Sequence, residues 1–170
     1  MGNFKIDADN LTWIGGRVND AEDLCLHGHA AAIIGDKIWE YNATVSATAL
    51  YLLKSLTEDH IIYKGNQMLP CCGFSVYAKN DLTEVDIIGC PNGIDWTVLH
   101  EGDVVRLITE DGEETVVDLE EYRAEVFRFA DKIEAFYESA TPKIMPKDRI
   151  DKDGYVAFWN EWKRRRGLDL

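Results

Sequence analysis

Three residues near the start of the chain alternate in sequence and belong to the types that bind transition metals. They are Cys25, His27 and His29. Because alternate residues of a β-strand point to the same face, a strand through this segment would present one thiol and two imidazoles together. Zinc takes such sulfur and nitrogen ligands, either four in tetrahedral geometry or three with a water molecule. Zinc binding is therefore one hypothesis, and a half-exposed strand with a buried cysteine is the simpler interpretation.

Other thiols and imidazoles could join this group only through the fold, namely Cys71, Cys72, Cys90 and His100. Cys71 and Cys72 are adjacent, which disfavours an unstrained disulfide, and the C-x-x-C spacing of redox pairs is absent. A cysteine nucleophile would also need a histidine base nearby. The alternative function that these residues define is a metal- or thiol-dependent enzyme, in which the 25–29 group acts with Cys71 or Cys72.

Negative charge is the second chemical signal, because the 170 residues carry a formal net charge of −13. The segment from Glu101 to Glu121 is rich in acids and contains Arg106 as its one basic residue. Nucleic acids bind basic patches, so this balance argues against a nucleic-acid partner. The simplest interpretation is a solvated face that maintains solubility. The sharper hypothesis is a docking surface for a basic protein, with contacts from Asp111, Glu113 and Glu114.

Aromatic residues gather near the C-terminus at steps of three and four, namely Tyr155, Phe158, Trp159 and Trp162. This spacing forms one side of a helix, and packing in the interior is the simpler interpretation. The basic run 163–166 follows directly, and Trp and Arg are enriched at binding hot spots. Partner contacts through Trp159 and Trp162 are therefore the alternative.

Helical periodicity predicts the elements that must position these residues. The strongest pattern predicts a long amphipathic helix over 118–140, with Asp118 and Glu121 as a capping box and Pro142 after its end. Apolar residues at helical steps predict a second helix over 45–56. A C-terminal helix over 152–166 should begin at a cap formed by Asp151 or Asp153.

Short alternating segments between turn residues predict strands over 11–18, 24–34, 37–41, 74–79, 85–90, 94–99, 104–109 and 115–117. The first of these contains a bulge or turn at Gly15-Gly16. Asp111-Gly112 favours the two-residue turn of a hairpin. We therefore predict an α+β fold in which an antiparallel meander sheet is covered by the long helix and the C-terminal helix.

Length and composition predict one domain over residues 1–170. With 46% hydrophobic residues the chain is apolar enough to fold. Residues 1–10 do not have the basic region and apolar run of a signal peptide, and no window approaches about 18 continuous apolar residues, so we expect a cytoplasmic protein that does not enter a membrane. Four cysteines, two of them adjacent, predict free thiols and no disulfide framework.

The C-terminal third carries a further pattern, formed by Tyr122, Phe129-Ala130-Asp131, Phe136-Tyr137, Gly154-Tyr155 and Phe158-Trp159-Asn160-Glu161-Trp162. It resembles the corresponding part of small, acidic, uncharacterised bacterial proteins that are similar to immunity proteins of toxin systems. The resemblance implies a protein that neutralises a cognate toxin by binding it. The leading prediction is therefore a protein-binding domain for a basic toxin domain, which needs no cofactor, with zinc reserved for the alternative.

Overall fold

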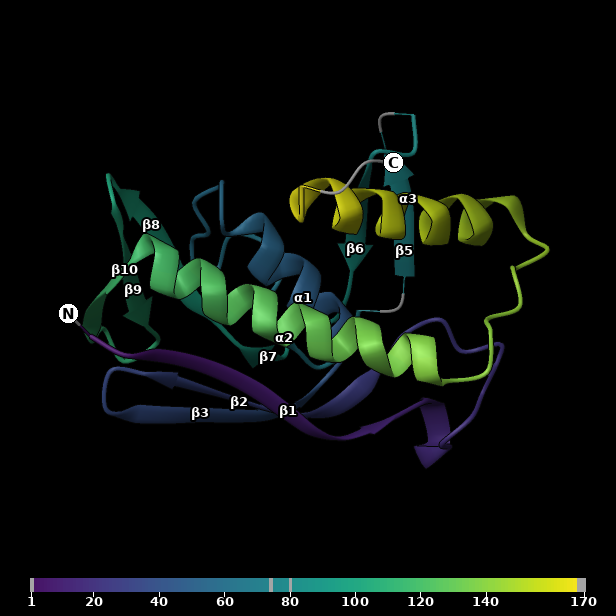
Figure 1. The fold of residues 1–170 in the computed structure, drawn as a ribbon, viewed down its shortest axis with the longest axis horizontal. Helices are drawn as coiled ribbons and strands as arrows, with labels where there is room; N and C mark the ends of the chain where they lie inside the picture. The colour runs from purple at the N-terminus through teal and green to yellow at the C-terminus, as the bar shows by residue number, and fades with distance from the viewer. Residues whose placement is uncertain (1, 74, 80, 168–170) are drawn as a thin grey trace.

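The computed structural model describes residues 2–73, 75–79 and 81–167. Its helices are α1 (Val45–Lys54), α2 (Leu119–Ser139) and α3 (Arg149–Arg165), with a short 3-10 turn η1 (Ile14–Gly16). Its strands are β1 (Phe4–Thr12), β2 (His27–Ile34), β3 (Lys37–Ala43), β4 (Leu69–Pro70), β5 (Ser75–Lys79), β6 (Glu84–Ile88), β7 (Gly93–Ile94), β8 (Trp96–Glu101), β9 (Val104–Thr109) and β10 (Glu114–Asp118). This content confirms the predicted α+β fold (Figure 1).

The strands within the described ranges pair antiparallel, but they form several sheets instead of one meander. β1-β2-β3 and β10-β9-β8 are three-stranded, while β4-β7 and β5-β6 are two-stranded. The predicted continuous sheet is interrupted because α1 and the irregular segment 55–68 separate β3 from the later strands. Figure 1 shows α2 running across the middle of the molecule, with the β1-β2-β3 sheet along one side and α3 with the β5-β6 hairpin on the other.

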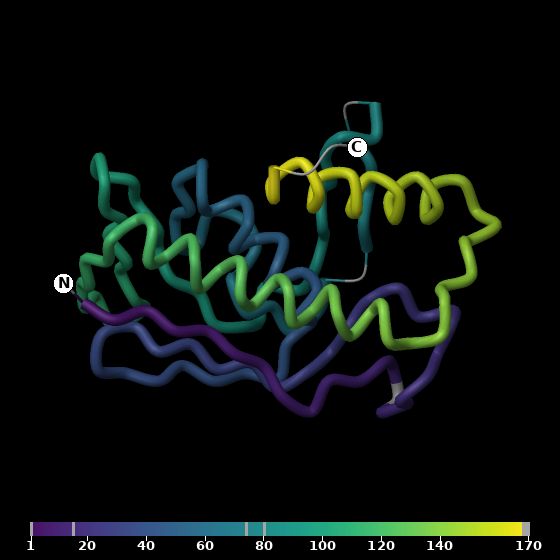
Figure 2. The backbone as a smooth tube through the Cα atoms, viewed as in Figure 1, coloured from purple at the N-terminus to yellow at the C-terminus, as the bar shows by residue number. Residues whose placement is uncertain are grey.

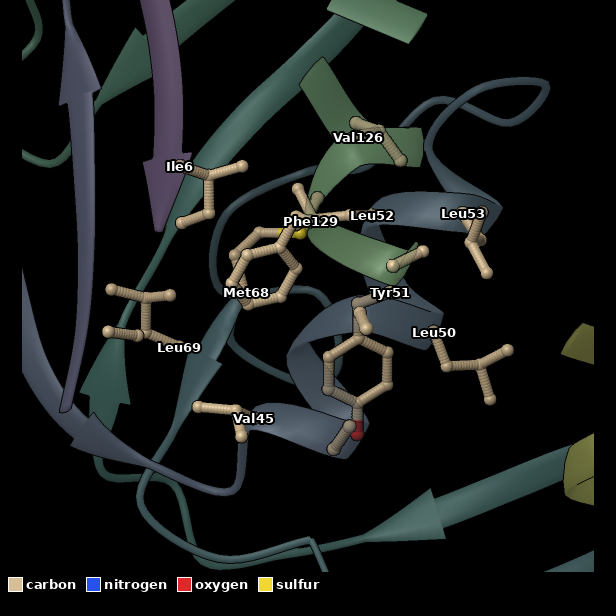
Figure 3. Packing of buried hydrophobic residues seen from close by; sticks show 14 of the residues in the cluster. Ile6, Val45, Leu50, Tyr51, Leu52, Leu53, Met68, Leu69, Val126 and Phe129 are labelled. Carbon is tan, nitrogen blue, oxygen red and sulfur yellow. The ribbon is translucent and has the colours of Figure 1, made fainter. Parts of the chain in front are cut away.

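The helix α1 lies at the centre of the hydrophobic core. Every residue of α1 except Lys54 is buried. A helix that is buried on all sides must pack against neighbours in every direction. Figure 3 shows its side chains beside Phe129 of α2, Ile6 of β1 and Met68 before β4. The predicted helix over 45–56 is therefore the central element, and α2 covers it.

The helix α2 begins as predicted, because the Asp118 carboxylate accepts hydrogen bonds from the backbone N–H groups of Glu120 and Glu121. The middle of its apolar stripe, from Tyr122 to Ile133, is buried. α2 packs on α1 and β1, and Figure 2 shows its backbone running alongside them. The buried carboxylate of Glu125 accepts the N–H of Ile6 at 3.3 Å and an Arg128 guanidinium N–H at 2.6 Å. This contact ties α2 to β1.

Two boundaries near the chain ends differ from the prediction. β1 spans Phe4–Thr12, because its buried residues alternate with charged ones from Phe4. The predicted strand over 11–18 is wrong beyond Thr12, where η1 follows. The predicted cap of α3 is also wrong, since Asp148 accepts the N–H groups of Ile150 and Asp151 and starts the helix earlier. Phe74 and Asn80, assigned from sequence to a strand and its turn, lie outside the described residues. No helix in the described part of the chain is long and apolar enough to cross a membrane.

Candidate functional site

The predicted metal ligands near the N-terminus do not come together as a ligand set. β2 begins at His27, so Cys25 lies before the strand, and its buried thiol donates to the Gly73 carbonyl at 3.9 Å. His27 faces Asp23 and His29 faces Asp9, each with a nitrogen–oxygen distance of 3.5 Å. Burial raises the pKa of Cys25 to about 12. These three side chains therefore have separate partners, and Cys25 is an ordinary core thiol.

The other three cysteines do come together. The Sγ atoms of Cys71, Cys72 and Cys90 all lie within 4.8 Å of one another, and within the described ranges no other group of three such ligand types is as close. The Cys71 and Cys90 sulfurs are 3.1 Å apart, and the Cys90 N–H donates to the Cys72 sulfur at 2.9 Å. The sequence suggested Cys71 and Cys72 as partners of the 25–29 group or as a reactive pair, and it left open whether they lie near Cys90.

The environment of this thiol cluster favours one thiolate. The hydrogen bond with Cys71 is the main cause that lowers the pKa of Cys90 to about 7, and a hydrogen bond with the backbone N–H of Asn92 is the second. The same sulfur–sulfur hydrogen bond, followed by partial burial, raises the pKa of Cys71 to about 11. All four histidines of the chain face a carboxylate elsewhere, namely His27, His29, His60 and His100. Thiols are ligands of the type that zinc takes. Among the described residues no histidine joins this cluster, so it lacks the base that cysteine catalysis requires.

A separate groove of about 920 Å³ lies where the loop before β2, the start of β5, the α2–α3 linker and α3 meet. This volume is within the range of natural binding pockets. Its apolar lining includes Ile14, Tyr77, Ile144 and Met145, all of which are exposed. Ile14 is 62% exposed and Ile144 is 58% exposed. Large apolar side chains that gather in one exposed place indicate an interaction surface.

Specific contacts hold the two segments that form the rim of this groove. The Ile144 N–H donates to the Ala21 carbonyl at 2.8 Å, which attaches the linker to the loop. The Lys143 ammonium donates to the Asp20 carbonyl at 2.6 Å and lies 3.0 Å from the Trp13 ring centroid. A cation over an aromatic face is stabilising. The backbone of the rim is therefore fixed while its apolar side chains stay exposed.

Acids outnumber bases around the groove. Its charged lining residues are Arg17, Asp20, Glu22, Asp23, Lys147 and Asp151. Arg17 is paired with Asp20 at 2.9 Å. Although burial would raise the pKa of Asp23, hydrogen bonds from His27 and from the backbone N–H groups of Cys25 and Ile14 lower it. Acids therefore exceed bases by two in the lining, and the Lys143 ammonium at the rim offsets one of them.

The acidic residues that the sequence singled out lie elsewhere, at the β9–β10 hairpin. Lys37 of β3 forms ion pairs with Asp111 and with Glu113, the latter at 2.8 Å. Glu114 is paired with Arg106 at 2.7 Å. The hydrogen bond from Lys37 is the main cause that lowers the pKa of Asp111 to about 2. These acids are partly neutralised within the chain, and partner binding at the hairpin stays a prediction.

The aromatic residues of α3 pack in the interior. Trp162 is completely buried, and its indole N–H donates to Glu134 at 3.1 Å. Trp159 is half-buried and packs edge-on against Tyr137, with 5.0 Å between the ring centroids. Trp162 is therefore unavailable as a surface anchor in this fold, because its side chain fills the space between α3 and α2.

The sequence did not reveal the groove, because its lining comes from distant parts of the chain, within 14–25, at Ser46, at 73 and 75–77, and within 144–158. One local signal was present, since Ile144 and Met145 are apolar residues in an otherwise polar linker. Comparisons with protein-family models, with curated proteins and with solved structures found no match for this chain.

Proposed function

We propose that the protein is a binding domain whose groove receives a cationic, amphipathic segment of a partner protein. The observation that carries this proposal is the coincidence of exposed apolar side chains and surplus acids in one groove. Each feature limits the partner in a different way. The apolar lining supplies binding free energy, and the acids select the sign of the partner's charge.

The apolar lining favours a polypeptide over a small ligand. Ile14, Ile144 and Met145 are exposed to solvent. Side chains that line an enclosed pocket would be largely buried. Drug-sized ligands are usually enclosed over most of their surface. An open apolar groove instead suits a peptide segment that inserts several side chains along one face. Burial of these residues would contribute about 25 cal/mol for each Å² of apolar surface removed from water.

The charge of the groove favours a cationic partner. Four of its charged lining residues are acids, Asp20, Glu22, Asp23 and Asp151, against Arg17 and Lys147. The formal net charge of −13 adds a long-range attraction for positive partners. Complementary charge raises the association rate and excludes anionic competitors. Lysine or arginine residues beside apolar ones are therefore the expected features of the bound segment.

The specific form of this function that we propose is immunity-type inhibition, in which the partner is a basic toxin domain. This form rests on the resemblance of the C-terminal third to immunity-like proteins. The hairpin acids Asp111, Glu113 and Glu114 are the rival location for the contact. Lys37 and Arg106 pair with these hairpin acids. In the groove Arg17 pairs with Asp20 and His27 faces Asp23, whereas Glu22 and Asp151 have no ion-pair partner among the described residues.

Selection from a random peptide library tests this proposal without knowledge of the partner. Wild-type protein should enrich peptides that combine lysine or arginine with apolar residues. The Ile144→Asp, Met145→Asp double variant should enrich no such peptides. Ile38→Asp is the control, because Ile38 is at least as exposed as Ile144 and Met145 but lies on β3 outside the groove. Enrichment of acidic peptides, or equal enrichment by the groove variant, would contradict the proposal.

A further inference from the structure

The three clustered cysteines are brought together by a short backbone pairing. Cys71 and Cys72 directly follow β4, and Cys90 lies in the loop before β7. β4 and β7 pair antiparallel, and the Cys71 N–H continues this pairing with the Asn92 carbonyl at 3.1 Å. Cys90 is therefore held beside two thiols that precede it by 18 and 19 residues.

Two glycines permit this close approach. A Cβ atom on Gly89 would lie 2.3 Å from the Cys72 carbonyl oxygen. A Cβ atom on Gly93, whose φ is +142°, would lie 2.4 Å from the Leu69 carbonyl oxygen. Both distances are far too short for any side chain. The loop that carries Cys90 thus has on each side a position that only glycine can occupy.

These thiols do not behave as core residues. Unreactive free cysteines are normally buried and pack like small apolar side chains, as Cys25 does. Cys71 is exposed, and Cys72 and Cys90 are half-buried. Three partly exposed thiols that face one another gain nothing from hydrophobic packing. Their arrangement is better explained by a shared ligand.

We infer that Cys71, Cys72 and Cys90 bind one zinc ion through their sulfur atoms, with the fourth coordination position open on the exposed side of Cys71. Zinc accepts three protein ligands and a water molecule in tetrahedral geometry. Two sulfurs on such an ion, with Zn–S bonds of about 2.3 Å, are about 3.8 Å apart. The Cys71 and Cys90 sulfur atoms are 3.1 Å apart, so a small rotation of their side chains would bring them to this separation.

The inference is independent of the proposed binding function, because the groove and the thiol cluster share no lining residue. The two sites are nevertheless adjacent in the chain. Gly73 lines the groove and directly follows Cys72, and its carbonyl accepts the thiol of Cys25. A metal ion at the cluster would therefore fix the start of the segment that leads into β5.

Cobalt substitution is the most specific test, since thiolate ligands give Co²⁺ an intense sulfur-to-metal charge-transfer band. Metal-free protein, kept reduced with a phosphine, would be titrated with Co²⁺ and then with Zn²⁺. We expect one equivalent of Co²⁺ to produce the band and Zn²⁺ to remove it by displacement. Zn²⁺ should also raise the midpoint of thermal unfolding. Wild-type protein that is folded but gives no charge-transfer band would overturn the inference.

Single substitutions identify the ligands. Loss of an outer-shell partner alone costs about tenfold or more in metal affinity, so removal of a ligand in Cys71→Ser or Cys90→Ser should weaken the affinity by at least that factor. Cys71 is exposed, so its replacement should leave the metal-free fold and its circular dichroism unchanged. Cys25→Ala is the matched control, because it removes a thiol outside the cluster and should retain full metal binding. Equal affinity in Cys71→Ser and wild type, or loss of the band in Cys25→Ala alone, would overturn the ligand set.

Discussion

Gly154 of α3 lies directly against the backbone of Val76 in β5, so that a Cβ atom at position 154 would stand 2.1 Å from the Val76 carbonyl oxygen. This contact sets the distance between the helix and the hairpin. Val76 also lines the groove, as do Tyr155 and Phe158 of the same helix. The shape of the groove therefore depends on a glycine in the first half of α3.

Replacement of Gly154 by alanine should destabilise the protein. Alanine favours a helix over glycine by about 1 kcal/mol, but the added methyl group must displace the β5 backbone, and overpacking costs about 1 to 3 kcal/mol or more. We expect a lower urea midpoint for Gly154→Ala. Lys152→Ala, at an exposed position of the same helix, should change the midpoint little. A stabilised Gly154→Ala protein would show that α3 does not contact β5 this closely.

The buried carboxylate of Glu161 should be a major determinant of the α3–β6 contact. It accepts the Val85 N–H at 2.8 Å and the Arg165 Nε–H at 2.8 Å, and it is completely buried. Glu161→Ala leaves these donors without an acceptor, so the free energy of unfolding should fall by about 3 to 5 kcal/mol. Glu58→Ala removes an exposed partner of Arg165 and should cost at most about 1 kcal/mol. Similar losses for both variants in urea titrations would contradict this difference.

The salt dependence of peptide binding should distinguish the groove from the β9–β10 hairpin. Neutralisation of the groove acids in Glu22→Gln, Asp151→Asn should weaken binding of a selected cationic peptide and reduce its dependence on ionic strength, since rim charges act mainly on association. The hairpin variant Asp111→Asn, Glu113→Gln should leave both properties unchanged. The reverse pattern in titrations at several salt concentrations would move the binding site to the hairpin.

The rate of alkylation should distinguish the clustered thiols from the buried thiol of Cys25. The pKa of Cys90 is lowered to about 7, first by the hydrogen bond with Cys71, whereas burial raises that of Cys25 to about 12. Because the thiolate is the nucleophile, the iodoacetamide rate of metal-free protein should rise through pH 7 and level off above about pH 8. Peptide mass mapping should find Cys90 modified first. Initial modification of Cys25 would contradict this order.

Strong local patterns made α1, α2 and the β9–β10 hairpin predictable from sequence. Asp118 has the acids of a capping box after it, and the cap forms as expected. The β9–β10 hairpin forms at the predicted place, but the predicted two-residue turn is wrong. Thr109 and Glu113 enclose a three-residue loop, in which only Gly112 has a positive φ, +81°. In α2 and the hairpin the deciding interactions lie within a few residues of one another, whereas α1 is held by the elements that bury it on all sides. Periodicity and capping are sufficient signals for elements of this kind.

The candidate sites depend on contacts between distant segments, so sequence patterns could not reveal them. The pairing that joins Cys72 to Cys90 uses two-residue strands, too short to have a periodicity. The linker at Ile144 is attached to the loop at Ala21 through backbone atoms, which carry no sequence signal. Alternation did suggest a shared face for Cys25 and His29, but the strand begins after the cysteine.

The affinity of one selected cationic peptide for three proteins tests the proposed binding function most directly. Fluorescence anisotropy titrations would compare wild type, Ile144→Asp and Ile38→Asp at a fixed salt concentration. We predict that Ile144→Asp binds about tenfold more weakly or worse, which corresponds to about 1.4 kcal/mol, while Ile38→Asp binds as wild type does. Equal affinity for all three proteins would contradict the proposal, because the peptide would then bind outside the groove.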